Sequence, residues 1–475
     1  MKANGEGLYI GARSQLAEKA GGDESANSGR EFYANMTIET IFALSSGLGR
    51  AGVAVLRLSG PGVREILTGM IGYVPEPRRA SLARFKAPAS GETIDLGLAL
   101  FFPAPASFTG EDCAEFHCHG GSAVVAAMLR AFAGFAATRP AQAGEFARRA
   151  FENGKLDLTE VEGLADLIEA ETEAQRRQAL RQVQGHLGRK AEAWRKSLLA
   201  ASALLEAEID FADEADVTMA RQDVTTAIAA LTQQLAAELA AARAGERLRE
   251  GLVVVIAGPP NAGKSTLINA LARREVAIVS PLPGTTRDAI EVHLDLQGLP
   301  VTLIDTAGLR DSPDPIEAIG MARTKARAGE ADLILWLSEA AAPVAPNLDA
   351  GAEIWPVLTK LDLLVADAAE TAPNRLRISA SSGQNLDLLV VRLAEFAAAT
   401  TGGGEGGLIT RERHRHAITA ALAALQGAQI EALTRAPELL AEDLRRAIRA
   451  LESLIGRIDV EDVLGEIFSR FCIGK

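Results

Sequence analysis

Residues 252–266 read LVVVIAGPPNAGKST, and this stretch decides the fold of the central part of the chain. Residues 252–256 are apolar and valine-rich, which is typical of a strand buried on both faces of a parallel sheet. The next segment, 258–265, fits the phosphate-loop pattern, in which glycines let backbone N–H groups turn toward phosphate oxygens. Residues 266–272 continue as a helix, whose N-terminus favours the same anion. Strand, loop and helix in this order predict a nucleotide-binding α/β domain.

Two further elements complete the expected phosphate and magnesium site. Lys264 is expected to meet the β- and γ-phosphates, and the Ser265 hydroxyl to ligate Mg²⁺. Residues 301–308, VTLIDTAG, form a hydrophobic strand that carries Asp305 to its polar end, where it can hold the Mg²⁺ shell. Gly308 can then offer its backbone N–H to the γ-phosphate.

Guanine is favoured over adenine by the segment Thr359-Lys360-Leu361-Asp362, which follows an apolar run at 354–358. The carboxylate of Asp362 can accept hydrogen bonds from the guanine ring N–H and amino group, and adenine would leave it unpaired. Residues 379–380 follow a short strand at 376–378 and match the last base-contacting loop. The expected GTP contacts are Asn261, Ala262, Gly263, Lys264, Ser265, Thr266, Ser280, Thr285, Thr286, Asp305, Thr306, Ala307, Gly308, Thr359, Lys360, Asp362, Ser379, Ala380 and Ser381.

One usual catalytic part is missing from this site. Leu309 stands where signalling GTPases place the glutamine that orients water. The missing function could come from a partner's arginine or from a monovalent cation. Asn261 offers an oxygen for such an ion, and residues 280–288, SPLPGTTRD, offer others. Thr286 is expected to take the remaining Mg²⁺ position.

Composition limits the function classes. The 475 residues include 49 Lys and Arg against 62 Asp and Glu, a net charge of −13, which argues against a broad non-specific nucleic-acid surface. No apolar run reaches the roughly 18 residues of a membrane span, so a cytoplasmic protein is expected. Cys113, Cys118 and Cys472 form no disulfide framework, and the first two are expected to be buried thiols.

Composition also changes along the chain and predicts several domains. Residues 1–35 are polar and read as a disordered extension or a misassigned start. Residues 36–153 are mixed α/β, with strands expected at 52–59 and 96–102, and 154–250 are helical. The nucleotide domain at 251–399 is inserted, and helices return at 400–475 after a glycine-rich segment expected to be a flexible linker, 400–407. Gly474 is expected to end the last helix and free the final side chains.

Motifs outside the nucleotide site are specific. They are GVAVLRLSG at 52–60, SFTGED at 107–112, Glu115 followed by HGG at 119–121, GEFARRAF at 144–151, GKLDL at 154–158 and FCIGK at 471–475. Together with the nucleotide motifs, they closely resemble the MnmE or TrmE family of tRNA-modification GTPases over residues 36–475. The chain departs from the family at Thr359, where the family has asparagine. Threonine keeps a hydroxyl but loses the amide, so nucleotide affinity could differ from the family's. Base selectivity should survive through Asp362.

The resemblance implies an N-terminal folate-binding domain that forms a homodimer, a helical domain and an inserted potassium-dependent GTPase. It implies folate contacts, with a 5-formyl or 5,10-methylene tetrahydrofolate, at Arg57, Glu115, Lys155 and Lys475. It implies K⁺ ligation by Asn261, Ser280, Leu282 and Thr285, and Mg²⁺ ligation by Ser265 and Thr286. It assigns catalytic roles to Lys264, to Glu317, which would orient the attacking water indirectly, and to Cys472, which would serve tRNA modification.

The resemblance also implies partners and a reaction. With a flavin-containing partner of the MnmG or GidA type, in a heterotetramer, members install an aminomethyl or carboxymethylaminomethyl group on carbon 5 of the wobble uridine of certain tRNAs. Two alternatives stay open. One is a ribosome-assembly or RNA-binding GTPase switch, and the other is a folate-dependent aminomethyltransferase with a regulatory GTPase domain. Without the family, Arg57 and Glu317 could be ordinary surface residues.

Overall fold

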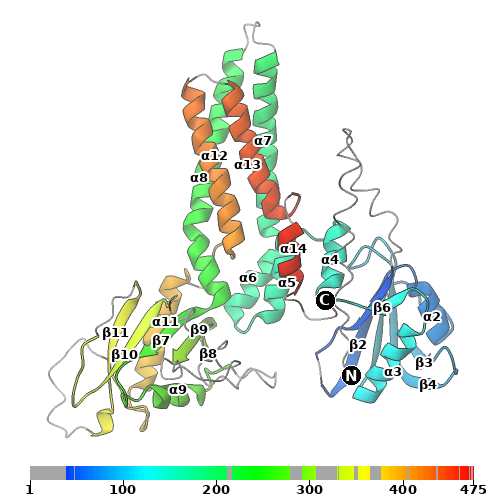
Figure 1. Cartoon of the computed structure of the whole chain (residues 1–475), viewed down its shortest axis with the longest axis horizontal. Helices are drawn as coiled ribbons and strands as arrows, with labels where there is room; N and C mark the ends of the chain where they lie inside the picture. The colour runs from blue at the N-terminus through cyan, green and yellow to red at the C-terminus, as the bar shows by residue number, and fades with distance from the viewer. Residues whose placement is uncertain are drawn as a thin grey trace, which may run out of the picture. The chain divides into compact units, whose positions relative to one another are not determined.

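The computed structural model describes residues 39–474 with gaps at 48, 211–216, 279–290, 306–328, 330, 347–350, 364–375, 404–405, 435–436, 459–460, 470 and 472–473. Two compact units make up the chain (Figure 1). The first comprises Met1–Phe146 and Ile473–Lys475, and the second comprises Ala147–Cys472. Each is described below on its own.

The first unit is built on a six-stranded sheet of order β3-β4-β5-β2-β1-β6, in which only the β1–β6 pair is parallel. The strands are β1 (Thr40–Leu44), β2 (Ala51–Ser59), β3 (Ser81–Lys86), β4 (Thr93–Phe102), β5 (Cys113–Gly120) and β6 (Thr138–Pro140). Two helices, α2 (Val63–Ile71) and α3 (Ser122–Ala133), pack on one face. Strand β2 alternates accordingly, with Leu56 and Leu58 buried in this core and Val55 and Arg57 on the other face.

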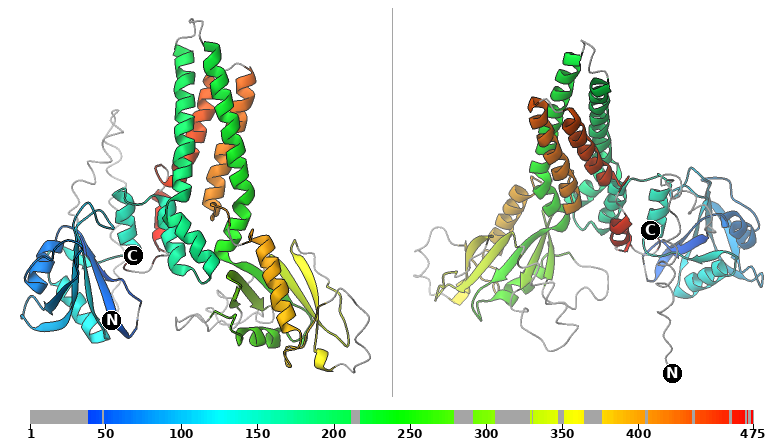
Figure 2. Two further views of the ribbon diagram at one scale, coloured as in Figure 1. Left: turned by 180° about the vertical axis from the view of Figure 1, so that it is seen from behind. Right: turned by 45° about the horizontal axis from the view of Figure 1, so that its top comes forward.

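The helical part of the second unit is a bundle of four long helices, drawn in green and orange in Figure 2. They are α7 (His186–Asp210), α8 (Val217–Glu250), α12 (Glu412–Thr434) and α13 (Pro437–Ile455). The buried residues of α7 are spaced alternately four and three apart, which keeps one stripe facing its neighbours. They are Leu187, Ala191, Trp194, Leu198, Ala201 and Leu205.

Shorter helices complete the helical part. They are α4 (Glu145–Glu152), whose first residues belong to the first unit, α5 (Leu158–Glu169), α6 (Glu173–Val183) and α14 (Glu461–Ser469). Asp157 and Thr172 cap α5 and α6, each accepting the N3 backbone N–H while the N3 side chain returns to the cap backbone. These reciprocal bonds satisfy two otherwise orphaned donors and fix where each helix begins.

The inserted part is a second six-stranded sheet, of order β12-β11-β10-β7-β9-β8, parallel except for β8. Its strands are β7 (Leu252–Ala257), β8 (Glu291–Leu296), β9 (Leu299–Asp305), β10 (Leu333–Glu339), β11 (Glu353–Thr359) and β12 (Leu376–Arg377). Helices α9 (Lys264–Ala272) and α11 (Leu386–Thr400) accompany it. Strands β7 and β9 are buried throughout, as their apolar sequences predict. The expected fold class, multidomain α/β plus α, is confirmed.

The glycine-rich return from the insert differs from the expected flexible linker where it is described. Thr401 and Ile409 are fully buried at its two ends. A Cβ at Gly407 would lie 2.6 Å from the carbonyl oxygen of Ala241, and one at Gly245 would lie 2.2 Å from that of Ile409. These glycines therefore allow two backbones to approach closely, a use of glycine that composition alone does not distinguish from flexibility.

Two further observations concern the cysteines and the helices. Cys113 and Cys118 are buried free thiols, as expected, and burial raises the pKa of Cys118 to about 11. Among the described residues, no helix is both long and apolar enough to cross a membrane.

Candidate functional site

Several of the expected nucleotide-binding residues lie at one edge of the second sheet, where four parallel strands have their carboxyl ends. Strands β7, β9, β11 and β12 all run in the same direction. The phosphate loop follows β7, Asp305 is the last residue of β9, Thr359 is the last residue of β11, and Ser379 lies just after β12. Ligands of open α/β sheets bind at this edge.

The phosphate loop requires unusual backbone at three positions. Gly258 has a φ of 146°, and a Cβ there would lie 2.1 Å from the carbonyl oxygen of Leu337 on β10. Gly263, at the N-cap of α9, has a φ of 89°. Asn261 also has a positive φ, 63°, a conformation that asparagine tolerates better than most residues. This loop shape directs backbone N–H groups inward, as an anion site needs.

Lys264 and Ser265 open α9 directly beneath this loop. The Lys264 Nζ donates to the carbonyls of Gly258 and Pro259, at 2.8 and 3.0 Å, so the ammonium lies along the loop. The Ser265 hydroxyl donates to Oδ2 of Asp305 at 2.9 Å. Hydroxyl and carboxylate oxygens are the ligands Mg²⁺ prefers, so this adjacent pair fits the metal that accompanies a nucleoside triphosphate.

Thr359 joins the phosphate loop to the base-binding loop. Its side chain is buried, and its hydroxyl is 2.7 Å from the carbonyl oxygen of Ala262 and 3.2 Å from that of Ser338. The single hydroxyl proton therefore ties the end of β11 to the loop after β7. This contact needs only a short donor, which threonine supplies as well as an amide.

Asp362 lies in the 3₁₀ turn Leu361–Leu363 and is held by two serines. Ser379 donates to Oδ1 at 2.5 Å and Ser381 donates to Oδ2 at 3.1 Å. The hydrogen bond from Ser379 is the main reason why the pKa of Asp362 is lowered, so the side chain is an acceptor-only carboxylate at neutral pH. The guanine N–H groups require such an acceptor.

One partner in this region was missed by sequence reasoning. The Nζ of Lys360 pairs with Glu339, the last residue of β10. Its only sequence signal is a carboxylate at the end of an apolar strand. The remaining expected nucleotide, metal and catalytic residues lie outside the described residues: Ser280, Leu282, Thr285, Thr286, Thr306, Ala307, Gly308, Glu317 and Cys472.

A second polar cluster lies on the face of the first unit's sheet opposite α2 and α3, beside the buried side chains of Ile41, Ala43 and Phe146. Arg57 on β2 is the direct cross-strand partner of Glu115 on β5. Its Nε and Nη2 donate to Oε1 of Glu115 at 3.1 and 2.9 Å, while Nε2 of His117 is 3.3 Å from Oε2. The guanidinium also lies 5.5 Å from the ring centroid of Phe108 and 6.0 Å from that of Phe146. The guanidinium of Arg57, the carboxylate of Glu115 and the two aromatic rings thus form one cluster.

The chain end also reaches this unit. The Ser45 hydroxyl donates to the carbonyl oxygen of Gly474 at 2.9 Å, and Gly474 is buried with a φ of 106°. A Cβ at Gly474 would lie 2.2 Å from the carbonyl oxygen of Leu44. Gly474 does not end the last helix, because α14 stops at Ser469, and this glycine instead allows a close docked contact. The side chain of Cys472, which Gly474 was expected to free, lies outside the described residues. Lys475 is outside the described residues, and Lys155 is an exposed residue of the second unit.

Comparison with known proteins resolves the class of this site. Residues 40–155 match the family described as the GTP-binding protein TrmE N-terminus, and residues 158–472 match the MnmE helical domain. A protein of Beijerinckia indica named tRNA modification GTPase MnmE is 60% identical over 445 residues, covering 92% of this chain and 96% of its own. The chain belongs to the MnmE family of tRNA-modification GTPases. A member of this family is a GTP hydrolase, which agrees with the phosphate loop after β7.

Other similarities extend this comparison. A Methylobacterium protein with the same name is 54% identical over 445 residues, covering 92% of this chain and all of its own. The G domain of the FeoB iron transporter of T. maritima is 25% identical and covers 31% of this chain and 98% of that chain, with a TM-score of 0.21. The latter likeness adds no argument about function.

Proposed function

We propose that this chain is a potassium-dependent GTPase that modifies carbon 5 of the wobble uridine of certain tRNAs. It would install an aminomethyl or carboxymethylaminomethyl group from a tetrahydrofolate one-carbon unit. The observation that carries the GTPase half is the Ser265–Asp305 pair at 2.9 Å beneath the phosphate loop. Family membership carries the tRNA half.

The potassium proposal rests on the phosphate loop. Asn261 is exposed and left-handed in backbone, within the loop that receives phosphates. We assign a K⁺ ion to its side-chain oxygen together with Ser280, Leu282 and Thr285, and Mg²⁺ to Ser265 and Thr286. The monovalent charge would replace that of an arginine finger, and Glu317 would orient water in place of glutamine.

The folate proposal rests on the Arg57 cluster. A guanidinium flanked by Phe108 and Phe146 suits a carboxylate or a flat ring, and Glu115 suits the N–H edge of a pterin. Docking of Gly474 supports a role for Lys475, because Gly474 contacts the end of β1, where Ala43 pairs with Arg57. We assign Lys155 to the same ligand.

The wider assignment follows the family. We propose a cytoplasmic homodimer, formed through the domain at 36–153, that acts with a flavin-containing partner of the MnmG type. The helical segments at 154–250 and 400–475 would hold the GTPase insert at 251–399. Cys472 would act in the modification itself.

Nucleoside analysis tests this function and separates it from two alternatives. A bacterial strain lacking its own MnmE is complemented with the wild-type chain or with Lys264→Ala, and its tRNA nucleosides are measured by mass spectrometry. We expect restored wobble-uridine modification with wild type only. Full modification with Lys264→Ala would favour a folate-dependent aminomethyltransferase with a regulatory GTPase domain. No restoration with wild type would favour a ribosome-assembly switch.

A further inference from the structure

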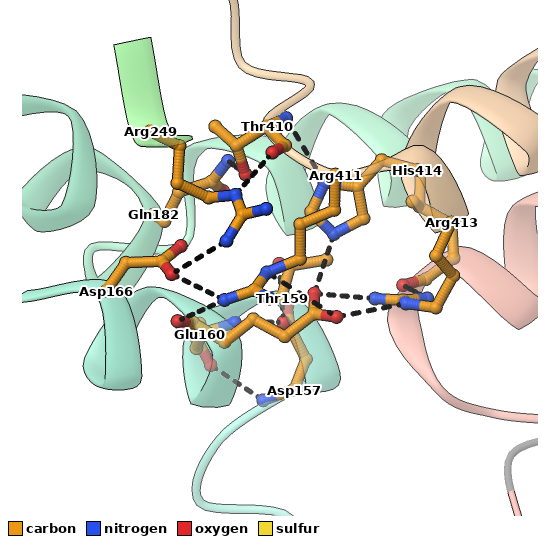
Figure 3. Close-up of polar contacts among 12 residues, drawn as sticks. Asp157, Thr159, Glu160, Asp166, Gln182, Arg249, Thr410, Arg411, Arg413 and His414 are labelled. Carbon is orange, nitrogen blue, oxygen red and sulfur yellow. Dashed lines mark hydrogen bonds and ion pairs between the residues drawn. The ribbon is translucent and has the colours of Figure 1, made fainter. Parts of the chain in front are cut away.

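A buried charged cluster lies where the GTPase insert leaves and rejoins the helical domain (Figure 3). Helix α5 supplies Glu162 and Asp166. Arg249 comes from the last turn of α8, just before β7, and Arg411, Arg413 and His414 come from the start of α12. None of these side chains takes part in the nucleotide site, so their burial needs another explanation.

Glu162 is the centre of one half of the cluster. Its side chain is 3% exposed and accepts from Arg413 at 3.1 and 2.7 Å and from Nε2 of His414 at 2.6 Å. Arg413 also donates to the carbonyls of Ser453 and Leu454 at the end of α13. One carboxylate therefore connects three helices that are distant in sequence.

The protonation states of this half follow from its hydrogen bonds. The Nδ1 of His414 accepts the backbone N–H of Thr410 at 3.5 Å, so the ring proton lies on Nε2 and points to Glu162. Burial lowers the pKa of His414. Burial alone would raise the pKa of Glu162, but His414 and Arg413 outweigh it and hold that pKa well below its usual value. Glu162 is thus a buried carboxylate compensated by donors.

Asp166 is the centre of the other half of the cluster. It connects the segment that leaves the helical domain with the segment that returns to it. It accepts from Arg411 and pairs with Nη1 of Arg249 at 3.8 Å. Arg249 in turn donates through Nε to the carbonyl oxygen of Thr410 at 2.8 Å. The outgoing and returning segments of the insert are therefore bonded to each other and to α5.

The cluster is not fully saturated. The Nε of Arg411 is buried and has no hydrogen-bond partner among the described residues, although Oε1 of Glu162 lies only 3.8 Å away. A cavity of about 40 Å³ is lined by Asp166, Arg249 and Gln175 among others. Arg411 thus has the carboxylate of Glu162 near its unpaired Nε, and the cavity lies beside Asp166 and Arg249.

The insert also contacts this region through the strand pair that carries Asp305. The backbone N–H of Ala174 on α6 donates to the carbonyl oxygen of Gly298, in the turn between β8 and β9, at 3.1 Å. Gln175, the next residue, donates to the carbonyl oxygen of Arg249 at 3.0 Å. A shift of β9 would therefore reach Arg249 through two hydrogen-bonded contacts.

The opposite face of α5 packs on the C-terminal helix. Val161, Leu164 and Ala165 share a hydrophobic cluster with Phe468 and Phe471, at the end of α14. Val161 is adjacent in sequence to Glu162. One helix thus contacts the root of the GTPase insert on one side and the C-terminal segment on the other.

We propose that Glu162 and Arg249 are positioning residues for tRNA modification, acting as a joint that transmits the nucleotide state of the insert through α5 to α14. Neither residue is among the expected nucleotide contacts. The segment that leaves the helical domain and the segment that returns to it are bonded to each other and to α5. We therefore expect the two segments to move together with α5 rather than independently. This role rests on GTP hydrolysis and tRNA modification by the family, and not on the folate or potassium proposals.

The test measures communication as well as activity. Hydrogen exchange of α14 is compared in the full chain with GDP and with the analogue GppNHp, for wild type, Glu162→Gln and Arg249→Lys. The matched control is Arg415→Gln, which removes a surface pair, Arg415 with Glu246 at 3.0 Å, between the same helices α8 and α12. GTP turnover and wobble-nucleoside content are measured in parallel.

We expect wild type and the control to show a nucleotide-dependent difference in α14 exchange, and both joint variants to lose it. Their GTP turnover should stay within about twofold while modification falls at least about tenfold. If Glu162→Gln fails to fold, Arg249→Lys decides. The proposal is overturned if α14 exchange is independent of nucleotide in wild type, if the difference persists in the variants, or if GTP turnover is lost with it.

Discussion

At the end of β11, Thr359 links two loops of the nucleotide site through its side-chain hydroxyl. The contact that matters to the fold is a donor to the carbonyl oxygen of Ala262, and the threonine hydroxyl makes it at 2.7 Å. We predict that base selection lies on a different residue, Asp362, whose two oxygens are held by Ser379 and Ser381. The two tasks are therefore separable by mutation.

The first prediction tests the hydroxyl group of Thr359 independently of the shape of the side chain. Thr359→Val is nearly isosteric but leaves the buried carbonyl oxygen of Ala262 without this donor, which costs about 1–3 kcal/mol. We expect GDP affinity to fall by roughly ten- to a hundredfold in titration calorimetry. Thr359→Ser is the control and should bind almost as wild type does. Equal affinity of the valine variant would show that the tie between the loops is unimportant.

A second prediction concerns Asp362. Asp362→Asn replaces the acceptor that guanine needs by an amide that suits xanthine. GTP affinity should fall by at least about a hundredfold, since two hydrogen bonds to a charged group are lost, while XTP affinity rises. Competition between GTP, XTP and ATP for a fluorescent nucleotide measures this. An unchanged order of preference would mean that the base is read elsewhere.

Among elements, two short segments depend on backbone geometry rather than on side-chain chemistry. The phosphate loop holds Asn261 at a positive φ, and the chain end holds Gly474 at a φ of 106° against Leu44. Asn261 is proposed to bind K⁺ and Gly474 to dock the chain end, and neither residue type suggests such a role by itself. In both segments, the backbone conformation determines which atoms the neighbouring side chains can approach.

The phosphate loop gives the third prediction. If Asn261 ligates the catalytic cation, GTP turnover should rise at least about tenfold when Na⁺ is replaced by K⁺. Asn261→Ala should abolish that rise without abolishing GDP binding, because the other loop contacts are backbone N–H groups and Lys264. Steady-state turnover in matched chloride salts provides the measurement. Similar rates in both salts for wild type would remove potassium from the mechanism.

The chain end gives the fourth prediction. Gly474→Ala should displace the docked segment, because its Cβ would meet the carbonyl oxygen of Leu44 at 2.2 Å. Wobble modification in the complemented strain should fall strongly while GTP turnover of the purified protein stays within about twofold. Gly465→Ala in α14 is the control, since a Cβ there meets nothing within 4 Å. Normal modification by Gly474→Ala would show that docking is dispensable.

At the scale of the whole molecule, the GTPase is inserted into a helical domain and held there by buried charge. Such a joint makes stability depend on pH in a residue-specific way. Glu162 has a lowered pKa, so its stabilisation is present above the unfolded value of 4.5 and is lost only as pH falls through the folded value. Burial raises the pKa of Asp166 to about 6, so its ionisation opposes folding above that pH.

The fifth prediction uses this contrast between two carboxylates on one helix. From pH 7 to pH 5, the stability difference between wild type and Glu162→Gln should stay constant. Over the same range, wild type should gain about 1 kcal/mol relative to Asp166→Asn, because folded Asp166 takes up a proton that the unfolded residue does not. Urea unfolding followed by circular dichroism measures both. Parallel trends for the two variants would contradict the assigned protonation states.

The sequence by itself determined the parts of this protein that are local. Strand, phosphate loop and helix at 252–272, Asp305 at a strand end and the guanine loop were all readable, because each motif is contiguous and parallel strands bring their carboxyl ends to one edge. The buried cysteines and the fold class followed from patterning. The roles assigned to residues in segments 279–290 and 306–328 remain predictions.

Only the tertiary structure decided the contacts between distant segments. Glu162 and His414 are 252 residues apart, and Ser45 and Gly474 are 429 apart, so no local pattern reports their bonds. Composition made the glycines at 400–407 a flexible linker, whereas Gly407 serves close backbone approach. The physical reason is common to all three: a buried charge or a glycine acquires its role from the partner that packing brings to it, and that partner is not encoded beside it.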